Sequence, residues 1–334
     1  MSSNDSYGGR VEPDQPKNRK RSTTAAKKAL QTAEQVFGQN HPKVATGRNN
    51  LAVLYYAEGK YAEAEMLLKK ALLFWEQTHG LYDLDLAASL NNLAEVHRSQ
   101  GQLGLAAALL ARALTICEKT LGPDHPDVAT NLHSLAALYC DQAQYAPAER
   151  FLQRALEISE KAVGPNHPDM AICLNNLAEV YRAQGQHETA ASLLARALQI
   201  SEKALGPDHP DVATNLNNLG LLHLAQSEYA EAEPLLQRAL AISKRSLGPV
   251  HPDVATSLHN VAALYRGKAK YMQAERLYKR ALKINEKSLG LNHPTVAISL
   301  KSLAALYRAM RQPEKADVLE KRASMIFGAP STGR

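Results

Sequence analysis

Aromatic residues and cysteines are scarce in this chain of 334 residues. Phe, Trp and Tyr together make up 5% of the sequence although 45% of the residues are hydrophobic, so alanine and leucine supply much of the apolar content. Such a composition favours closely packed helices over β-sheets. The three cysteines, Cys117, Cys140 and Cys173, form no CxxC pair and are odd in number, which predicts buried thiols in a reducing compartment rather than a disulfide framework.

Long apolar runs are also lacking. No uncharged apolar stretch reaches the roughly 18 residues that a membrane-spanning helix needs. The N-terminus, MSSNDSYGGRVEPDQPKNRKRS, has no apolar segment of the kind that a secretory signal requires. We therefore expect a soluble, cytoplasmic protein with no membrane partner.

A strong charge excess is missing from most of the chain. The formal net charge is +6, but residues 1–28 hold seven Lys and Arg against three Asp and Glu. The remainder is nearly neutral, so the basic isoelectric point does not indicate a nucleic-acid-binding array. Residues 1–21 are rich in Ser, Asn, Gly, Pro and charge, and we expect them to form a disordered basic tail.

What the chain does contain is an internal repeat. A His-Pro step occurs at six positions, with one gap of 84 residues followed by four gaps of 42 residues: His41, His125, His167, His209, His251 and His293. The long gap contains a degenerate copy in which Asp83 and Leu84 replace His-Pro. A constant period of this length is typical of stacked supersecondary units. We predict seven full repeats over residues 41–327 and a short disordered tail over residues 328–334.

Each repeat reads as two helices. The first begins at the His-Pro step, where proline is tolerated in the first turn, and ends near a short loop such as Glu58-Gly59-Lys60. The second ends at a glycine stop of the Leu-Gly-Pro type. Residues 22–40 match only a second helix, and we expect this half repeat to cap the stack.

Alanine recurs at three positions of every repeat but one, where Gly220 takes its place. Small residues on facing helices permit close approach. The first position lies on the first helix and the other two on the second helix: Ala52, Ala94, Ala136, Ala178, Ala262 and Ala304; Ala64, Ala106, Ala148, Ala190, Ala232, Ala274 and Ala316; Ala71, Ala113, Ala155, Ala197, Ala239, Ala281 and Ala323.

The pattern Leu-Ala/Gly-x-x-Tyr, then Tyr-x-x-Ala, then a second Ala seven residues on resembles the tetratricopeptide (TPR) repeat. The 42-residue form, with HPDVA, NNLA, YAEAE and RAL, is similar to the repeats of kinesin light chain. The resemblance covers residues 23–327. It implies an all-α, right-handed superhelical solenoid of antiparallel helix pairs with a concave peptide-binding groove. No kinesin binding follows from it, because residues 1–22 have no heptad pattern.

By the same resemblance, three positions on each first helix line the groove. Asparagine persists there despite its middling helix propensity, and its amide suits a peptide backbone. Arginine follows the tyrosine position and suits carboxylates. The candidate site residues are Asn49, Asn91, Asn92, Arg98, Asn175, Asn176, Arg182, Asn217, Asn218, His259, Asn260, Arg266, Lys301 and Arg308.

A second interpretation of these residues stays open. The asparagines could bridge adjacent repeats, and the arginines could simply be solvated. Glu95 and Glu179 stand three residues before Arg98 and Arg182 and should neutralise them in part. Ala263 and Ala305 occupy the corresponding positions before the last two arginines, Arg266 and Arg308, so we expect the C-terminal half to attract an anion more strongly.

No constellation of residues indicates catalysis. The chain has twelve histidines, but those of the His-Pro steps each belong to a separate repeat and do not converge as zinc ligands must. The LGPDHP turn lacks the Lys-Ser/Thr of a phosphate loop. We expect a non-catalytic scaffold without a cofactor that binds a protein or peptide ligand with acidic side chains. A self-assembling structural array and the sensor arm of a signalling system are the alternatives.

Overall fold

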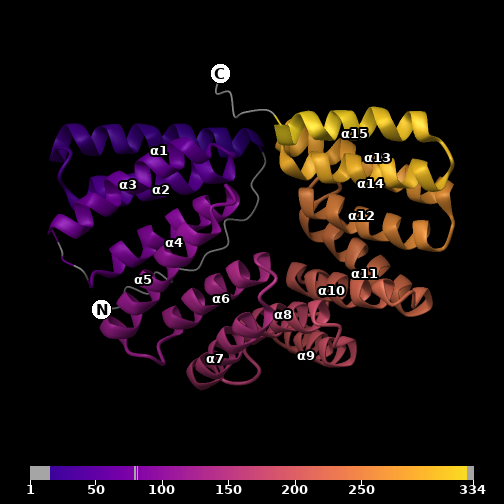
Figure 1. The fold of residues 1–334 in the computed structure, drawn as a ribbon, viewed down its shortest axis with the longest axis horizontal. Helices are drawn as coiled ribbons and strands as arrows, with labels where there is room; N and C mark the ends of the chain where they lie inside the picture. The colour runs from indigo at the N-terminus through magenta and orange to yellow at the C-terminus, as the bar shows by residue number, and fades with distance from the viewer. Residues whose placement is uncertain (1–15, 79, 81, 329–334) are drawn as a thin grey trace. The chain divides into compact units, whose positions relative to one another are not determined.

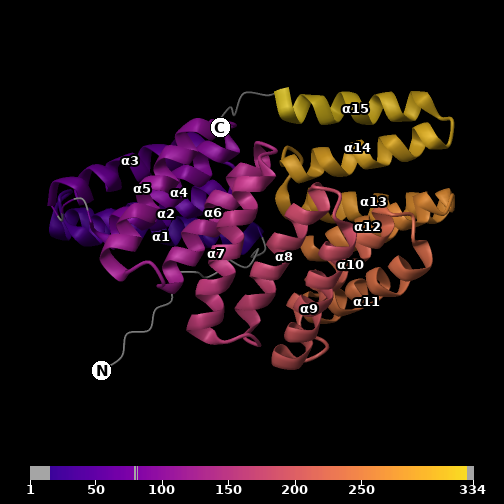
Figure 2. The same cartoon turned by 60° about the horizontal axis from the view of Figure 1, so that its bottom comes forward.

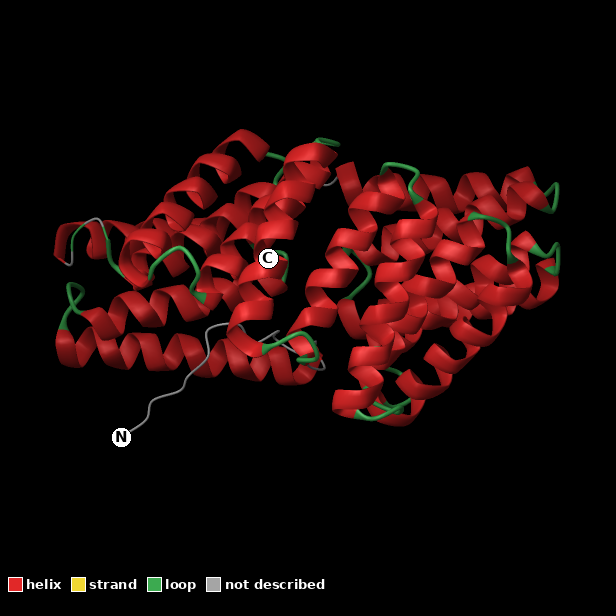
Figure 3. Cartoon of the chain, turned by 90° about the horizontal axis from the view of Figure 1, so that it is seen from below, coloured by secondary structure: helices red, strands yellow, loops and turns green. Residues whose placement is uncertain are grey.

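The computed structural model describes residues 16–78, 80 and 82–328, and within them every regular element is an α-helix (Figure 3). Figure 1 shows the helices in chain order, and their bounds are α1 Pro16–Phe37, α2 Pro42–Ala57, α3 Tyr61–Thr78, α4 Leu84–Ser99, α5 Leu103–Leu121, α6 Pro126–Asp141, α7 Tyr145–Val163, α8 Pro168–Ala183, α9 His187–Leu205, α10 Pro210–Ala225, α11 Tyr229–Leu247, α12 Pro252–Gly267, α13 Tyr271–Leu289, α14 Pro294–Ala309 and α15 Pro313–Gly328. The predicted all-α class is confirmed.

The helices pack in antiparallel pairs. The even-numbered helices α2 to α14 are the first helices of the repeats, and each packs against the second helix that follows it. The pair α14 and α15 is seen side by side in Figures 1 and 2. The packing forms two compact units, one of helices α1–α7 and one of helices α8–α15, each of which is described by itself.

The His-Pro step fixes where a first helix begins. In α10 the His209 backbone is extended, and its Nδ1 accepts a hydrogen bond from the backbone N–H of Asp211 at 3.2 Å, while Pro210 takes the first helical position. The imidazole thus acts as an N-cap, satisfying a donor that the helix leaves unpaired. Asp83 does the same for α4, with bonds of 2.8 and 3.1 Å from Asp85 and Leu86. The degenerate copy therefore keeps the function of the step with a different side chain.

The turn inside each repeat requires left-handed backbone. Gly59, Gly101 and Gly185 take φ angles of 74°, 76° and 80°, which cost glycine little. At the corresponding position of another repeat Ala143 is held at φ 55°, where its Cβ crowds the carbonyl. The loop that the sequence marks with glycine in some repeats is therefore the same turn in all of them.

The recurring alanines lie where the helices approach most closely. All of them are at most 1% exposed. Leucines that stand between two of these alanines in sequence, such as Leu68 and Leu110, are also buried and are 1% exposed. The close approach of the helices predicted at the alanine positions is confirmed.

First helices of neighbouring repeats also touch one another. In the N-terminal unit α2 contacts α4 and α4 contacts α6, and in the C-terminal unit α8 contacts α10 and α10 contacts α12. Each unit is thus layered, with first helices in one layer and second helices in the other. The candidate site residues belong to the first layer.

Helix α1 begins earlier than the sequence suggests. It starts at Pro16, inside the segment 1–21 that we expect to be disordered, because Pro suits a first helical position and the Lys and Arg that follow are good helix formers. It packs against α2, with Leu30 buried in the core of the N-terminal unit. The expected disorder of residues 1–15 and 329–334 lies outside the described residues.

Candidate peptide-binding site

The asparagines of the candidate site form bridges between adjacent first helices. In the N-terminal unit the Asn92 amide donates to Asn49 Oδ1 at 3.1 Å. In the C-terminal unit Asn218 donates to Asn175 at 3.1 Å and Asn260 donates to Asn217 at 3.2 Å. Each bond joins residues 43 positions apart, so the donor lies one repeat further along the chain than the acceptor.

Most of the remaining amide capacity in these bridges is also used. Asn175 Nδ2 donates to the Ala171 carbonyl at 2.8 Å and to the buried Asn215. Asn217 Nδ2 donates to Ser257 Oγ at 3.2 Å. Interior amides left unpaired would cost free energy, so these networks hold neighbouring repeats in register. This favours the inter-repeat interpretation of the asparagines over direct contact with a peptide backbone.

Two candidate asparagines lie outside this ladder of bonds. Asn176 on α8 is exposed. Asn91 on α4 is half-buried, and its Oδ1 accepts no hydrogen bond from the part of the chain that the structure describes. Asn176 thus keeps its amide at the surface of the first-helix layer, whereas the Oδ1 atom of Asn91 is buried.

The arginines differ in how far their charge is compensated. Arg98 is bonded to Glu95 at 2.9 Å and to Asp141 on α6 at 2.8 Å, and Arg182 is paired with Glu179 on its own helix. The partial neutralisation predicted for these two arginines is confirmed. Asp141 neutralises Arg98 further, and the sequence did not predict this pair because Asp141 lies on a different helix, α6.

Arg308 is also compensated, contrary to the expectation from Ala305. Its guanidinium contacts Asp317 at 2.9 Å and Glu320 at 2.7 Å, both on α15. Glu320 and Asp317 raise the pKa of Arg308, and the Arg308 guanidinium in turn lowers the pKa of Glu320. The pairing escaped sequence reasoning because its partners come from the next helix, where Glu320 replaces the leucine of earlier repeats.

Arg266 is different, because it is exposed and forms no ion pair with any described residue. His259 stands seven residues before Arg266 on the same helix, α12. Burial, and then the positive charge of Arg266, lower the pKa of His259. The His259 ring packs edge-on against Tyr278 at 5.0 Å, and its Nε2 lies 3.3 Å from Ser302 Oγ on α14. Lys301, beside that serine, is exposed. We call these three side chains on α12 and α14, namely Arg266, Lys301 and His259, the Arg266 cluster.

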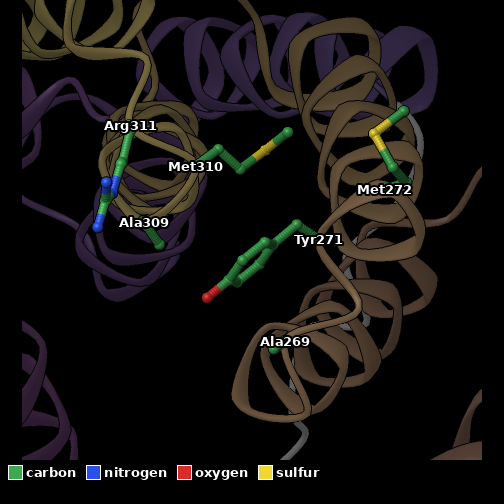
Figure 4. A pocket seen from close by; sticks show the side chains of 6 residues that line it. All are labelled: Ala269, Tyr271, Met272, Ala309, Met310 and Arg311. Atoms are coloured by element: carbon green, nitrogen blue, oxygen red, sulfur yellow. The ribbon is translucent and has the colours of Figure 1, made fainter.

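A small apolar pocket lies at the turn end of the same repeats. Figure 4 shows Tyr271 and Met310 projecting into the space between the start of α13 and the end of α14, and the space measures about 380 Å³. Its lining residues are Ala269, Tyr271, Met272, Ala309, Met310 and Arg311. No sequence signal singled out these residues, since they come from two turns that only the fold brings together.

Within the described residues, no group of three His, Cys, Asp or Glu side chains is placed to hold a metal ion. None of the helices described is long and apolar enough to cross a membrane. His97, which stands at a tyrosine position, is 5% exposed and hydrogen-bonded to Gln102, which makes it a core residue.

In the part of the chain that the structure describes, α1 is followed by antiparallel helix pairs that share this turn and this alanine pattern, and such pairs define a helical repeat array. The chain belongs to the tetratricopeptide repeat family, whose sequence profile matches residues 20–77, 85–161, 137–203, 169–245, 211–287 and 253–327. Repeats of this family are protein-binding units. No curated protein matches the sequence.

Solved structures extend the comparison. The chain is similar to BtubC (BKLC) from P. vanneervenii, with 25% identity and a TM-score of 0.58 over 69% of this chain and 92% of the other. It is similar to a putative kinesin light chain from Podosopora anserina with nearly identical TPR-like repeats, at 29% identity and a TM-score of 0.53 over 62% and 98% of the two chains. The predicted kinesin-light-chain-like type of repeat is confirmed.

A third similarity concerns the fold alone. The quorum sensor NprR from B. thuringiensis, in its apo form, shares 15% identity with a TM-score of 0.68 over 92% of this chain and 84% of the other. Regulatory TPR proteins and kinesin light chains are thus both among the structural neighbours.

Proposed function

We propose that the chain is a non-catalytic adaptor that binds an acidic protein segment on the first-helix layer of its C-terminal unit. The observation that carries the proposal is the uncompensated charge of Arg266, since Arg98, Arg182 and Arg308 all have carboxylate partners. An exposed guanidinium offers a planar pair of donors to a carboxylate. The asparagine bridges give this surface a rigid base, which lowers the entropy lost on binding.

Only part of the candidate site contacts the partner. The cluster of Arg266, Lys301 and His259 receives the acidic side chains, and the bridged asparagines act as scaffold. Arg98 contributes little because two carboxylates already hold it. The Tyr271 pocket, at the turn end of the same repeats, is suited to an apolar side chain.

The test is a calorimetric titration of the partner that the full chain captures in a pull-down. We expect Arg266→Glu to weaken binding by tenfold or more, because it replaces attraction by repulsion at a central contact. Arg98→Glu serves as the matched control. It should change the affinity by less than about threefold, which is the size of effect expected from one exposed ion pair. Equal losses in the two variants, or none in either, would place the binding surface elsewhere.

A further inference from the structure

A ladder of ion pairs joins successive second helices along their outer layer. A glutamate near the end of one second helix contacts an arginine 36 residues later, on the second helix of the next repeat. The N–O distance is 2.6 Å in each pair: Glu76 with Arg112, Glu118 with Arg154, Glu202 with Arg238, and Glu286 with Arg322.

The ladder is broken between α11 and α13. Lys244 stands where the other repeats have glutamate, and it faces Arg280, the arginine of the next repeat. Burial and then the charge of Arg280 lower the pKa of Lys244. Neither has an ion pair with a described residue. Arg280 thus occupies the arginine position of the ladder, but the glutamate that pairs with this arginine in other repeats is replaced by Lys244.

A second carboxylate is missing at the same junction. One repeat earlier, Asp208 in the loop after α9 pairs with Arg245 at 2.7 Å. Val250 replaces this aspartate in the loop after α11 and is 50% exposed, so Lys287 has no acidic partner there. The loop itself is unchanged, because the Val250 carbonyl accepts from Ser288 at 3.2 Å as the Asp208 carbonyl accepts from Ser246 at 3.2 Å.

The two cations that lack these carboxylates, Arg280 and Lys287, belong to a continuous row of cationic side chains on α13, which we call the stripe. Arg276, Arg280, Lys283 and Lys287 are exposed and recur at helical spacing, so they share one face. The helix has only two acidic residues, and both are engaged elsewhere. Glu275 pairs with Lys279 and Glu286 pairs with Arg322, each at 2.6 Å. No described carboxylate pairs with any side chain of the stripe.

We propose that this stripe, formed by Arg276, Arg280, Lys283 and Lys287 with Lys244 beside it, is a second docking surface that receives an acidic segment of a partner protein. The segment supplies the carboxylates that the chain itself provides at the preceding junction. Arg280 and Lys287 are seven residues apart on a helix, a rise of about 10 Å. A peptide in the polyproline II conformation has three residues per turn and rises about 9 Å per turn, so acidic side chains at every third position lie on one face and match that distance.

The surface favours a protein segment over nucleic acid. Single-stranded nucleic acid is held by aromatic side chains on which bases stack as well as by cations, and the stripe has no aromatic member. The exposed side chain of Val250 lies in the loop that precedes α12 and offers an apolar contact instead. The stripe belongs to the second-helix layer, so it is distinct from the Arg266 cluster on the first helices.

The test uses the full chain at low ionic strength and a fluorescently labelled peptide with glutamate at every third position and serine elsewhere. Fluorescence anisotropy should show binding of this peptide and not of the same peptide with glutamine for glutamate. The double variant Lys244→Glu with Val250→Asp rebuilds the junction as it is one repeat earlier. We expect it to bind the peptide about tenfold more weakly, because two exposed cations become paired.

Controls separate the stripe from other surfaces. Lys70→Glu makes a comparable reversal of an exposed lysine on α3 and should leave the affinity unchanged. Lys283→Gln weakens the stripe without introducing a new pair and should lower the affinity if the double variant does. Circular dichroism melts confirm that each variant is folded.

Three outcomes would overturn the proposal. The first is an acidic peptide that does not bind the parent chain, or that binds the double variant equally well. The second is a loss of affinity in Arg266→Glu but not in the double variant, which would assign the peptide to the first-helix layer. The third is a labelled oligothymidylate that binds more tightly than the peptide and is weakened by the same substitutions, which would make the stripe a nucleic-acid surface.

Discussion

At the scale of single residues, two side chains of different chemistry perform one task. His293 Nδ1 accepts from the Thr295 N–H at 3.2 Å, and Asp83 accepts two N–H groups at the start of α4. A cap needs only an acceptor on a short side chain with extended backbone. The repeated histidines are therefore explained by helix initiation, and none of them has to be a metal ligand.

This role predicts the effect of changing the cap. His293→Ala should destabilise the C-terminal unit by about 1 kcal/mol, because the Thr295 N–H at the start of the helix loses its side-chain acceptor. His293→Asp should retain the stability of the parent, as Asp83 does for α4, and no acidic residue adjoins this position to oppose it. Urea unfolding followed by circular dichroism measures both. Equal losses for alanine and aspartate would mean that the ring packs rather than caps.

At the scale of the element, the helix pairs depend on a turn that many residues tolerate poorly. The left-handed residue is glycine in some repeats, and it is Ala143, Ser227, Ala269 or Arg311 in the others. A residue with a Cβ is strained at this φ. The pairs with glycine are thus better adapted to the turn than the others.

Relief of this strain is measurable. Ala143→Gly should stabilise the N-terminal unit by about 1 kcal/mol, since φ 55° suits glycine and the exposed alanine side chain contributes little packing. The reverse change, Gly185→Ala at φ 80°, should destabilise by a similar amount. The midpoint of urea unfolding reports both effects. A midpoint that falls in Ala143→Gly would show that backbone entropy outweighs the strain.

At the scale of the whole molecule, a stack of repeats needs a cover at each end. At the N-terminal end α1 packs on α2, where Leu30 is 7% exposed, Thr23 donates to Glu58 at 2.7 Å and Glu34 pairs with the buried Arg48 at 3.1 Å. These contacts make α1 part of the N-terminal unit.

Truncation tests the role of α1. A chain that begins at Gly38 should expose the apolar face of α2, lower the unfolding midpoint and speed hydrogen exchange in α2 and α3. A chain that begins at Ser22 keeps Leu30, Thr23 and Glu34 and should exchange like the parent. Exchange in α2 that is equally slow in both truncations would contradict a capping role for α1.

The sequence alone determined the class, the repeat boundaries and the core. A constant 42-residue period, the His-Pro starts and the alanine positions are local signals that do not depend on which helices meet. The neutralisation of Arg98 by Glu95 was equally predictable, because i,i+3 neighbours on one helix always face each other.

Only the tertiary structure decided which polar groups remain available. The bridge from Asn218 to Asn175 and the pairing of Arg308 with Glu320 join different helices, and the charge of Arg280 on α13 acts on Lys244 of α11. Which side chains meet across helices depends on the crossing of the helices and on the offset between repeats. A one-dimensional pattern does not contain those distances, and for this reason the sequence did not predict that the asparagines bond to one another across repeats or that Arg266 and the α13 stripe lack an ion pair with a described residue.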